Sequence, residues 1–336
     1  MKALVLHAVH EQPRYVDYAD PMPAPGEVLV QVRAAALNRR DYFVTQGLYP
    51  GIVLPIILGS DGAGVCEGRD VIINPNINWG DNPAVQSKYY NILGLPKNGT
   101  LAEQVAVAAD RLHDKPAHLD WAQAAALPLA GMTAWRALFT KGQVQPGHHV
   151  LVTGAGGGVA LFAIQFALAA GAQVFVTTGS HEKLERAKQL GASGGAIYRD
   201  SDWDRQLAAQ CAGFDVVIDS AGGPGFPSLL KLCNPGARVV IYGGTVGKIP
   251  DVSPQLIFWR QLAILGSTMA NDTEFKAMLE FVNHHHIVPI VDSVFDLADG
   301  AEAFKRLAAN TQFGKIILIL SKPPIAHQHE THRSPL

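Results

Sequence analysis

A short glycine-rich stretch constrains this chain more than any other feature of its sequence. Residues 154–158 read Gly-Ala-Gly-Gly-Gly, between the apolar runs His149–Thr153 and Val159–Ala170. A strand, a glycine turn and a helix in this order form the first βα turn of a dinucleotide-binding sheet. Backbone N–H groups at the helix N-terminus bind the pyrophosphate, and glycine lets it approach closely.

We expect the backbone of this turn to contact the cofactor. The dinucleotide-binding fingerprint reads G-x-G-x-x-G/A. In the register that fits best, its three positions fall on Ala155, Gly157 and Ala160, so alanine replaces the first glycine and is the permitted alternative at the third. The flanking strand and helix favour this interpretation over a glycine loop with a purely structural role. The residues expected to contact the cofactor here are Gly156, Gly157, Gly158 and Val159.

The end of the second strand indicates which cofactor binds. An NAD site places Asp or Glu about 20 residues after the turn, where the carboxylate holds the ribose 2′-OH. Here the strand ends in Thr177-Thr178-Gly179-Ser180, and Lys183 follows. A hydroxyl and an ammonium suit a phosphate, so we expect NADPH, with its 2′-phosphate near Ser180 and Lys183. The alternative for Lys183 is a solvated position on a helix face.

The pattern of apolar runs divides the chain into two parts. The first third alternates short β-rich runs with Gly and Pro, which indicates a mostly β unit. From about residue 149, strands alternate with helices, which predicts a doubly wound parallel sheet of the α/β class. After residue 266 we expect the chain to return to the first unit. The expected strands are Ala3–Leu6, Val28–Ala34, Gly62–Cys66, Val71–Asn74, His149–Thr153, Gln173–Thr177, Phe214–Asp219, Arg238–Tyr242, Leu262–Leu265 and Lys315–Leu320, and the expected helices are Val159–Ala170, Glu182–Leu190, Asp272–His285 and Leu297–Leu307.

Charge and composition exclude several classes of partner. The chain has 27 Lys and Arg against 29 Asp and Glu, so no basic field attracts nucleic acid or an anionic membrane, and we expect a small-molecule substrate. The longest apolar stretch is shorter than the roughly 20 residues that span a bilayer. The first residues do not form a signal-peptide pattern, and there are three cysteines without a CxxC spacing. We therefore expect buried thiols and a cytoplasmic location.

Two groups of histidines are not expected to bind a metal. His284, His285 and His286 are consecutive and fall at the end of an expected helix, so their side chains point in different directions. Residues 321–336 are rich in Pro and His without an apolar period, which is typical of a frayed tail. Their histidines are interpreted as solvated side chains.

Further motifs occur in order along the chain. They read PGEVLV at 25–30, ALNRRD at 36–41, GLYP at 47–50, LGSDGAGV at 58–65, GTLAE at 99–103, AAALP at 124–128 and FGKI at 313–316. With these motifs the chain resembles the medium-chain dehydrogenase/reductase superfamily over nearly its whole length, and within it the zinc-free quinone oxidoreductases and enoyl reductases. The resemblance implies a GroES-like catalytic domain at 1–122 and 267–336, an inserted Rossmann domain at 123–266, NADPH between them and a homodimer.

The resemblance also implies which residues surround the cofactor. Those implied for the 2′-phosphate are Gly179, Ser180, Lys183 and Tyr198; those for the adenosine and phosphates are Phe313, Gly314 and Lys315; and those for the nicotinamide side are Gly243, Gly244 and Thr245, with Thr133 near the cofactor. Each of these roles is carried over from the family.

Zinc-dependent members of the superfamily need a Cys in the segment that is Asn38–Asp41 here, and a His-Glu pair where this chain has Ser60-Asp61. Both are missing. Without a Lewis acid, a quinone or an α,β-unsaturated carbonyl accepts hydride more readily than an alcohol releases it. We therefore expect NADPH-dependent reduction of such an acceptor. The alternatives are an NADPH-binding sensor or structural protein with little turnover and, less favoured, an alcohol dehydrogenase.

Three polar residues are candidates on the catalytic side: Tyr49, Asn38 and Ser60. The phenol of Tyr49 can donate a hydrogen bond or a proton to an oxyanion, and the alternative is a turn tyrosine packed beside Pro50. Asn38 either contacts the cofactor or substrate or is a buried amide that ties down the backbone. The sequence does not name the acceptor, and the short connection Gly64–Val71 leaves the local shape of the cleft open.

Overall fold

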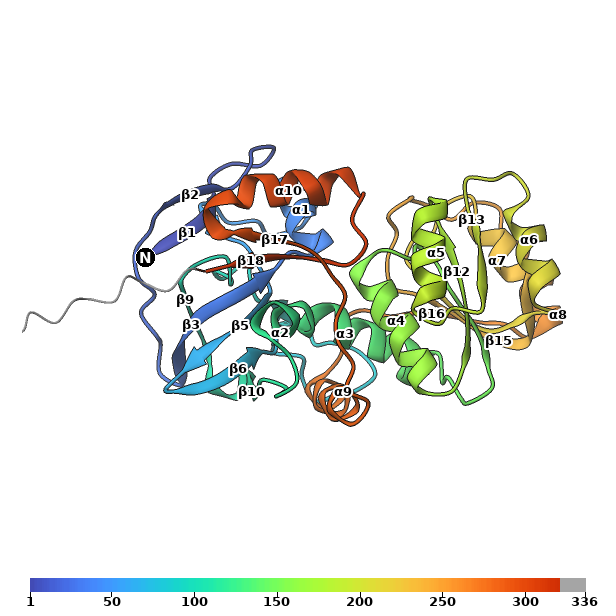
Figure 1. Cartoon of the computed structure of the whole chain (residues 1–336), viewed down its shortest axis with the longest axis horizontal. Coiled ribbons are helices and arrows are strands. Elements are labelled where there is room, and N and C mark those ends of the chain that lie inside the picture. The colour runs from blue at the N-terminus through green and yellow to red at the C-terminus, as the bar shows by residue number, and fades with distance from the viewer. Residues whose placement is uncertain (321–336) are drawn as a thin grey trace, which may run out of the picture.

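The chain forms two large β-sheets that lie side by side along its long axis (Figure 1). The structure is a computed structural model that describes residues 1–320. One sheet is made of strands that end no later than Asp114 and of two strands that begin at or after Val291. The strands of the other sheet come from the part of the sequence between these two groups. After forming the second sheet, the chain therefore returns to the first one.

The sheet on the right of Figure 1 has six parallel strands in the order β13-β12-β11-β14-β15-β16. Because helices cover both faces, its central strands are apolar on both sides, and Val150, Leu151 and Val152 are 0% exposed. This arrangement confirms the doubly wound α/β class. Its elements are β11 (His149–Val152), α4 (Gly158–Ala169), β12 (Gln173–Thr178), α5 (His181–Gln189), β13 (Gly194–Ile197), α6 (Trp203–Gln210), β14 (Phe214–Asp219), α7 (Phe226–Lys231), β15 (Cys233–Ile241), α8 (Pro254–Arg260) and β16 (Ala263–Gly266).

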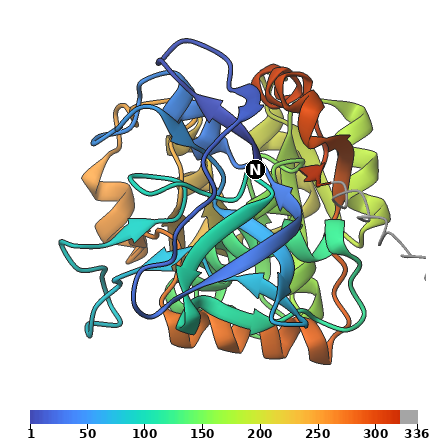
Figure 2. The ribbon, with the colours of Figure 1, turned by 90° about the vertical axis from the view of Figure 1, so that its left-hand side faces the viewer.

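The other sheet has seven strands and is mostly antiparallel. Its order is β10-β6-β5-β3-β18-β17, with β9 also paired to β3. Figure 2 faces this part of the molecule, with α10 above and α9 along the lower edge. Its elements, with the smaller strands beside them, are β1 (Lys2–Leu6), β2 (Arg14–Asp17), β3 (Glu27–Ala36), α1 (Arg39–Thr45), β4 (Ile56–Ile57), β5 (Asp61–Cys66), β6 (Arg69–Ile73), β7 (Asn76–Ile77), β8 (Asn91–Ile92), β9 (Gln104–Ala108), β10 (Leu112–Asp114), α9 (Asp272–His284), β17 (Val291–Asp296), α10 (Gly300–Ala309) and β18 (Lys315–Ile319).

Two short helices that the sequence pattern does not predict, α2 (Trp121–Ala126) and α3 (Pro128–Trp135), connect the sheets. All residues of α3 except the last are buried, so the helix lacks the apolar and polar faces by which a surface helix is recognised. One buried apolar cluster contains α2 and α3 together with Ala36 of β3 and Val152 of β11. The two sheets are thus joined by a continuous core.

The expected elements also omit the helices α1, α6, α7 and α8 and the strands β2, β4, β7, β8, β9, β10 and β13. The remaining differences are local. Strand β15 begins at Cys233 instead of Arg238. The short connection Gly64–Val71 is a tight hairpin in which Glu67 and Gly68 adopt positive φ and Cys66 pairs with Arg69. This hairpin needs no long loop, because the two strands reverse over two residues.

Three further expectations concern the cysteines, the histidines and membrane-spanning helices. All three cysteines are unpaired and buried, as expected. Helix α9 ends at His284, so the histidine triplet does lie at a helix end. Over residues 1–320, every helix is too short or too polar to cross a bilayer. His327, His329 and His332 lie outside the described residues.

Candidate active site

The glycine turn lies between β11 and α4, at the carboxyl edge of the parallel sheet. Gly154 and Gly156 have φ values of +71° and +124°, which side chains rarely adopt. Gly157 is the N-cap of α4, and within residues 1–320 no side chain caps this helix end, so its first N–H groups are available to an anion. The positive φ values fall on Gly154 and Gly156, whereas Gly157 has a φ of −75°.

Four residues implied for the 2′-phosphate lie together where β12 and β13 end. The N–H of Tyr198 donates to the carbonyl of Thr178 over 3.0 Å. A Cβ on Gly179 would lie 2.6 Å from the Tyr198 hydroxyl, so a side chain at this position would displace the tyrosine ring. Ser180 is the N-cap of α5, and its Oγ accepts a hydrogen bond from the N–H of Lys183. The Ser180 hydroxyl proton therefore remains available to a ligand.

The side chain of Lys183 is half-buried and lies beside the glycine turn. Its Nζ donates to the carbonyl of Asn310 over 3.2 Å, and its Cδ would be 3.1 Å from a Cβ on Gly156. Burial lowers the pKa of Lys183, and the nearby charge of Asp292 opposes this effect. A bound phosphate would stabilise the ammonium, so this position favours a ligand contact over a solvated helix face.

The segment that carries Phe313 and Gly314 touches the turn from the side of the other sheet. The N–H of Gly314 donates to the carbonyl of Gly156 over 3.0 Å. Gly314 has a φ of +130°, and a Cβ there would lie 2.5 Å from the carbonyl oxygen of Ile290. The guanidinium of Arg186 lies 4.1 Å from the centre of the Phe313 ring. These contacts place Phe313 and Gly314, which the family resemblance assigns to the adenosine and phosphates, beside the glycine turn and α5.

The loop after β15 leaves space near the cofactor turn. A Cβ on Gly244 would meet no heavy atom within 4 Å, whereas one on Gly243 would lie 2.8 Å from the Ser220 carbonyl. Thr245 Oγ1 donates to the same carbonyl over 3.3 Å. Gly243 and Thr245 are thus held against the end of β14, while the space beside Gly244 stays open for a ligand.

The carboxylate of Asp219 joins the ends of β11 and β14. It accepts from Thr153 Oγ1 over 2.7 Å and from the N–H of Gly222 over 2.8 Å. Burial raises the pKa of Asp219, and these hydrogen bonds oppose the increase. This network fixes the carboxyl edge of the sheet, where ligands of such sheets bind.

A buried cluster from three distant segments lies on the catalytic side. Lys315 Nζ is 2.9 Å from Asp61 Oδ2 and 2.6 Å from Asn38 Oδ1, and Asn38 Nδ2 donates to Asp61 Oδ2 over 2.8 Å. All three side chains are nearly inaccessible. Both polar atoms of the Asn38 amide therefore bind buried groups, the oxygen an ammonium and the nitrogen a carboxylate.

This cluster reaches the cofactor turn and α3. A Cβ on Gly158 would lie 2.7 Å from Lys315 Cδ, so the lysine stem packs directly on the start of α4. The other oxygen of Asp61 accepts from the N–H of Leu129 over 2.7 Å. One turn later, Thr133 Oγ1 donates to the Leu129 carbonyl over 2.7 Å, which places Thr133 on the helix beside the cluster.

A second group of polar side chains adjoins the first. Arg40 Nη1 donates to Ser60 Oγ over 2.7 Å and to the Leu93 carbonyl over 3.0 Å, and Ser60 Oγ donates to the same carbonyl over 2.7 Å. The guanidinium lies 5.4 Å from the centre of the Tyr49 ring, which is half-buried. Tyr49 and Ser60, both expected on the catalytic side, are thus brought together by Arg40.

Asp41 holds the backbone of this region. Its carboxylate accepts from the N–H of Asn38 over 2.8 Å and from the N–H of Gly59 over 3.2 Å. It is 0% exposed, and burial raises its pKa, with the charge of Arg40 acting in the opposite direction. Because both oxygens bind backbone groups, we assign Asp41 to support of the site.

Comparisons with known proteins agree with this geometry. The family described as "Alcohol dehydrogenase GroES-like domain" matches residues 24–117, and the one described as "Zinc-binding dehydrogenase" matches residues 158–284. A "Zinc-type alcohol dehydrogenase-like protein YogA" of Leptosphaeria maculans is 36% identical over 329 residues, which cover 89% of this chain and 92% of the relative. The chain belongs to the medium-chain dehydrogenase/reductase superfamily. The resemblance to this superfamily expected from the sequence motifs is confirmed.

Other members of the superfamily carry different names. Human quinone oxidoreductase is 29% identical over 317 residues, covering 90% of this chain and 92% of the relative. A crystal structure described as an NAD-dependent alcohol dehydrogenase has a TM-score of 0.90 and 36% identity, and covers 96% of this chain and all of that one. Membership in the superfamily therefore establishes the fold of a nicotinamide-dependent oxidoreductase. It does not identify the substrate, which has to be inferred from the residues of the site.

Sequence reasoning within the superfamily missed several residues of this site. Asp61 lies inside a recognised motif, yet its partner Lys315 is 254 positions away. Arg40 and Asp41 also lie in a recognised motif, and nothing in their spacing indicates which backbone groups they bind. The positive φ of Gly154 could have been found by placing the first glycine immediately after the strand.

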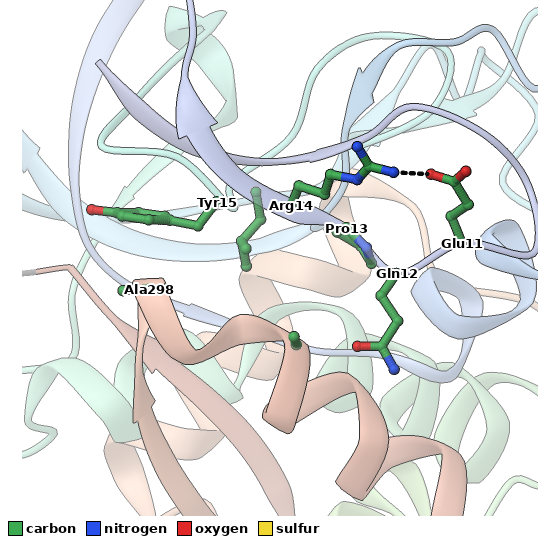
Figure 3. A pocket seen from close by; sticks show the side chains of 8 residues that line it. Glu11, Gln12, Pro13, Arg14, Tyr15 and Ala298 are labelled. Carbon is green, nitrogen blue, oxygen red and sulfur yellow. Dashed lines mark hydrogen bonds and ion pairs between the residues drawn. The ribbon is translucent and has the colours of Figure 1, made fainter.

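A separate surface groove does not belong to this superfamily site. It has a volume of about 520 Å³ and lies between β2 and α10 (Figure 3). Its lining residues are Leu4, Glu11, Gln12, Pro13, Arg14, Tyr15, Ala298 and Ala301. Arg14 and Glu11 pair with each other over 3.0 Å, so their charges are already compensated. None of its lining residues belongs to the glycine turn or to the cluster of Lys315, Asp61 and Asn38.

Proposed function

We propose that this protein is an NADPH-dependent oxidoreductase that transfers hydride to a quinone or an α,β-unsaturated carbonyl compound without zinc. The observation that carries the proposal is the end of β12, where Ser180, Lys183 and Tyr198 stand in place of an acidic residue. Two hydroxyls and an ammonium fit a 2′-phosphate, which a carboxylate would repel. The uncapped start of α4 and the open space at Gly244 fit the rest of the nucleotide.

The proposed cofactor contacts follow from this fit. They are Thr133, Gly156, Gly157, Gly158, Val159, Gly179, Ser180, Lys183, Tyr198, Gly243, Gly244, Thr245, Phe313, Gly314 and Lys315. We propose a division into a catalytic domain at 1–122 and 267–336 and a nucleotide domain at 123–266, in which the two sheets correspond to the two domains.

The donor set on the catalytic side favours chemistry without zinc. Zinc prefers thiolate, imidazole and carboxylate ligands and takes three from the protein in catalytic sites. The cluster around Asn38 contains two carboxylates, Asp41 and Asp61, and both accept hydrogen bonds from backbone N–H groups. Asp61 also forms an ion pair with Lys315. This set of donors would have to be dismantled to hold a metal.

When bound, NADPH supplies a hydride to the acceptor. The tasks left to the protein are to orient the reactants and to stabilise the charge that develops on the acceptor oxygen. We propose that the Tyr49 phenol donates a hydrogen bond or proton to that oxygen. Asn38 positions Lys315 and Asp61, and Ser60 positions Arg40, because their polar atoms are engaged in those contacts.

We also propose a homodimer and a cytoplasmic location. Strand β16 is at the edge of the parallel sheet, and Ile264 within it is 36% exposed. Helix α8, which precedes it, exposes 62% of Phe258 and 83% of Trp259. A second copy of the chain would cover this apolar edge. The three free cysteines fit a reducing compartment.

The test is NADPH oxidation across a panel of quinones, enones and aldehydes, repeated with NADH, with metal analysis of the same sample. Turnover of quinones or enones with a preference for NADPH and no stoichiometric zinc supports the proposal. Stoichiometric zinc with alcohol oxidation overturns it. Tight NADPH binding without turnover of any acceptor would assign the protein to a sensor role instead.

A further inference from the structure

Arg40 carries a buried positive charge without a carboxylate partner. The residue is 8% exposed, and within residues 1–320 no carboxylate oxygen lies within 4.0 Å of its nitrogens. Two other buried cations in the protein are paired: Arg136 with Glu274 over 2.6 Å, and Lys315 with Asp61 over 2.9 Å. A buried charge is unfavourable unless an opposite charge compensates it. Within the described residues Arg40 therefore forms no direct ion pair, although its charge interacts with the neighbouring carboxylate of Asp41.

The two sides of the Arg40 guanidinium differ. Nη1 is engaged by Ser60 Oγ and the Leu93 carbonyl. Within residues 1–320, Nε is buried without a hydrogen-bond partner. The hydrogen bonds of the side chain in this part of the chain come from Nη1, so Nη2 donates none. Nε and Nη2 form one flat edge of the guanidinium, and their two parallel N–H groups match the two oxygens of a carboxylate. The edge formed by Nε and Nη2 therefore matches a carboxylate in geometry.

This edge belongs to the catalytic side of the cofactor site. Ser60, which orients Arg40, directly precedes Asp61, and Asp61 binds the lysine whose stem packs on Gly158 of the cofactor turn. The Tyr49 ring covers the guanidinium. An anion bound to Arg40 would therefore lie next to the proposed proton donor.

We propose that Arg40 determines acceptor specificity by binding a carboxylate of the substrate through its Nε and Nη2 edge. The inference rests on the proposed function and narrows it: the acceptor is an α,β-unsaturated carbonyl compound that carries a carboxylate. Hydride from NADPH adds to the β-carbon, the π electrons move to the carbonyl oxygen, and the α-carbon then takes a proton from Tyr49 or water. NADP⁺ and the saturated ketone are the products, and the carboxylate is unchanged.

The experiment compares 3-benzoylacrylic acid with its methyl ester as acceptors for the wild-type protein and for R40M. The wild type should reduce the acid with a kcat/KM about 10- to 100-fold above that for the ester, as charge-assisted hydrogen bonds predict. In R40M the two acceptors should be equal, mainly because KM for the acid rises. R40K should keep part of the preference, since it retains the charge without the flat edge.

The matched control is R39M, which removes a positive charge at the adjacent position. Arg39 already donates to the Leu307 carbonyl and to Asn310 Oδ1, so it has no free edge of this kind. The preference for the acid should persist in R39M. A wild-type protein that reduces the ester as well as the acid would overturn the role of Arg40 while leaving the proposed function intact.

A binding measurement separates failure of the site from failure of the reaction. Benzoate should raise the melting temperature of the wild type and of R39M, and leave that of R40K less affected, even if no acceptor is reduced. Equal shifts in all three proteins would overturn the proposal. A preference for 1,2- over 1,4-naphthoquinone that depends on Arg40, with no acid preference, would also overturn it and assign the edge to vicinal dicarbonyls.

Discussion

Lys315 Nζ lies 2.9 Å from Asp61 Oδ2, and the two side chains are 4% and 0% exposed. Asn38 binds both, and the stem of Lys315 packs on Gly158. The pair therefore connects the catalytic sheet to the start of α4. Any change in its charge balance acts on the acceptor side and the cofactor turn together.

Removal of the lysine charge should destabilise the protein strongly. K315M leaves the Asp61 carboxylate buried without its partner, and we expect the free energy of unfolding in urea to fall by about 3–5 kcal/mol. The double variant D61N/K315M should lose less than K315M, because no unpaired charge remains. K305M, which breaks an exposed pair with Glu302, should change stability by less than about 1 kcal/mol. Wild-type stability of K315M would contradict the assignment.

Cofactor preference should depend on Lys183. K183A removes the ammonium beside Ser180 and the glycine turn, so KM for NADPH should rise about 10- to 100-fold while KM for NADH stays close to the wild-type value. Steady-state kinetics with both nucleotides measure this. K188A on the same helix, whose lysine is exposed and paired with Glu185, should leave both values unchanged. An equal rise for the two nucleotides would show that Lys183 does not read the 2′-phosphate.

Acid stability should depend on Asp292. Burial alone would raise its pKa, but hydrogen bonds from Arg306 and from the N–H of Phe313 outweigh burial and hold the pKa below its ordinary value of 3.8. The folded-state pKa is lower than the unfolded one, so the stabilisation is present above about pH 4 and is lost as the pH falls through the folded-state value. D292N should therefore lower the free energy of unfolding by about 1–3 kcal/mol at pH 7.

The same difference between D292N and the wild type should shrink below pH 4. Urea unfolding at several pH values tests this. A difference that stays constant down to pH 2.5 would mean that D292N acts through packing and not through its charge.

The oligomeric state should respond to the apolar edge of the parallel sheet. W259E places a charge on the most exposed large apolar side chain of α8, and a dimeric wild type should become monomeric, as light scattering after size-exclusion chromatography would show. V294E introduces the same charge at a residue that is 51% exposed in β17, and it should stay dimeric. A monomeric wild-type protein would refute the dimer.

The parts of the fold that could be predicted depend on local signals. The strand, glycine turn and helix at 149–170 are encoded by adjacent residues, and the absence of an acid after β12 follows from the same segment. Helix α3 could not be predicted, because it is apolar on every side and has no period. The contact of Asn38 with Lys315 joins residues 277 positions apart, and no spacing rule connects them. The structure shows that both polar atoms of the Asn38 amide bind other residues of the protein. It also shows that Nε of Arg40 has no hydrogen-bond partner among the described residues.

The strand order also determines when the site can form during synthesis. Ile317 of β18 pairs with Ala36 of β3, so the catalytic sheet stays open until a segment near the end of the sequence has been made. The strands of the parallel sheet come from one continuous segment, and that sheet can fold first. Lys315 arrives with β18, and before that Asp61 has no counter-charge. A chain that has not yet reached β18 therefore lacks a closed active site, so the enzyme becomes competent only after this strand has been made.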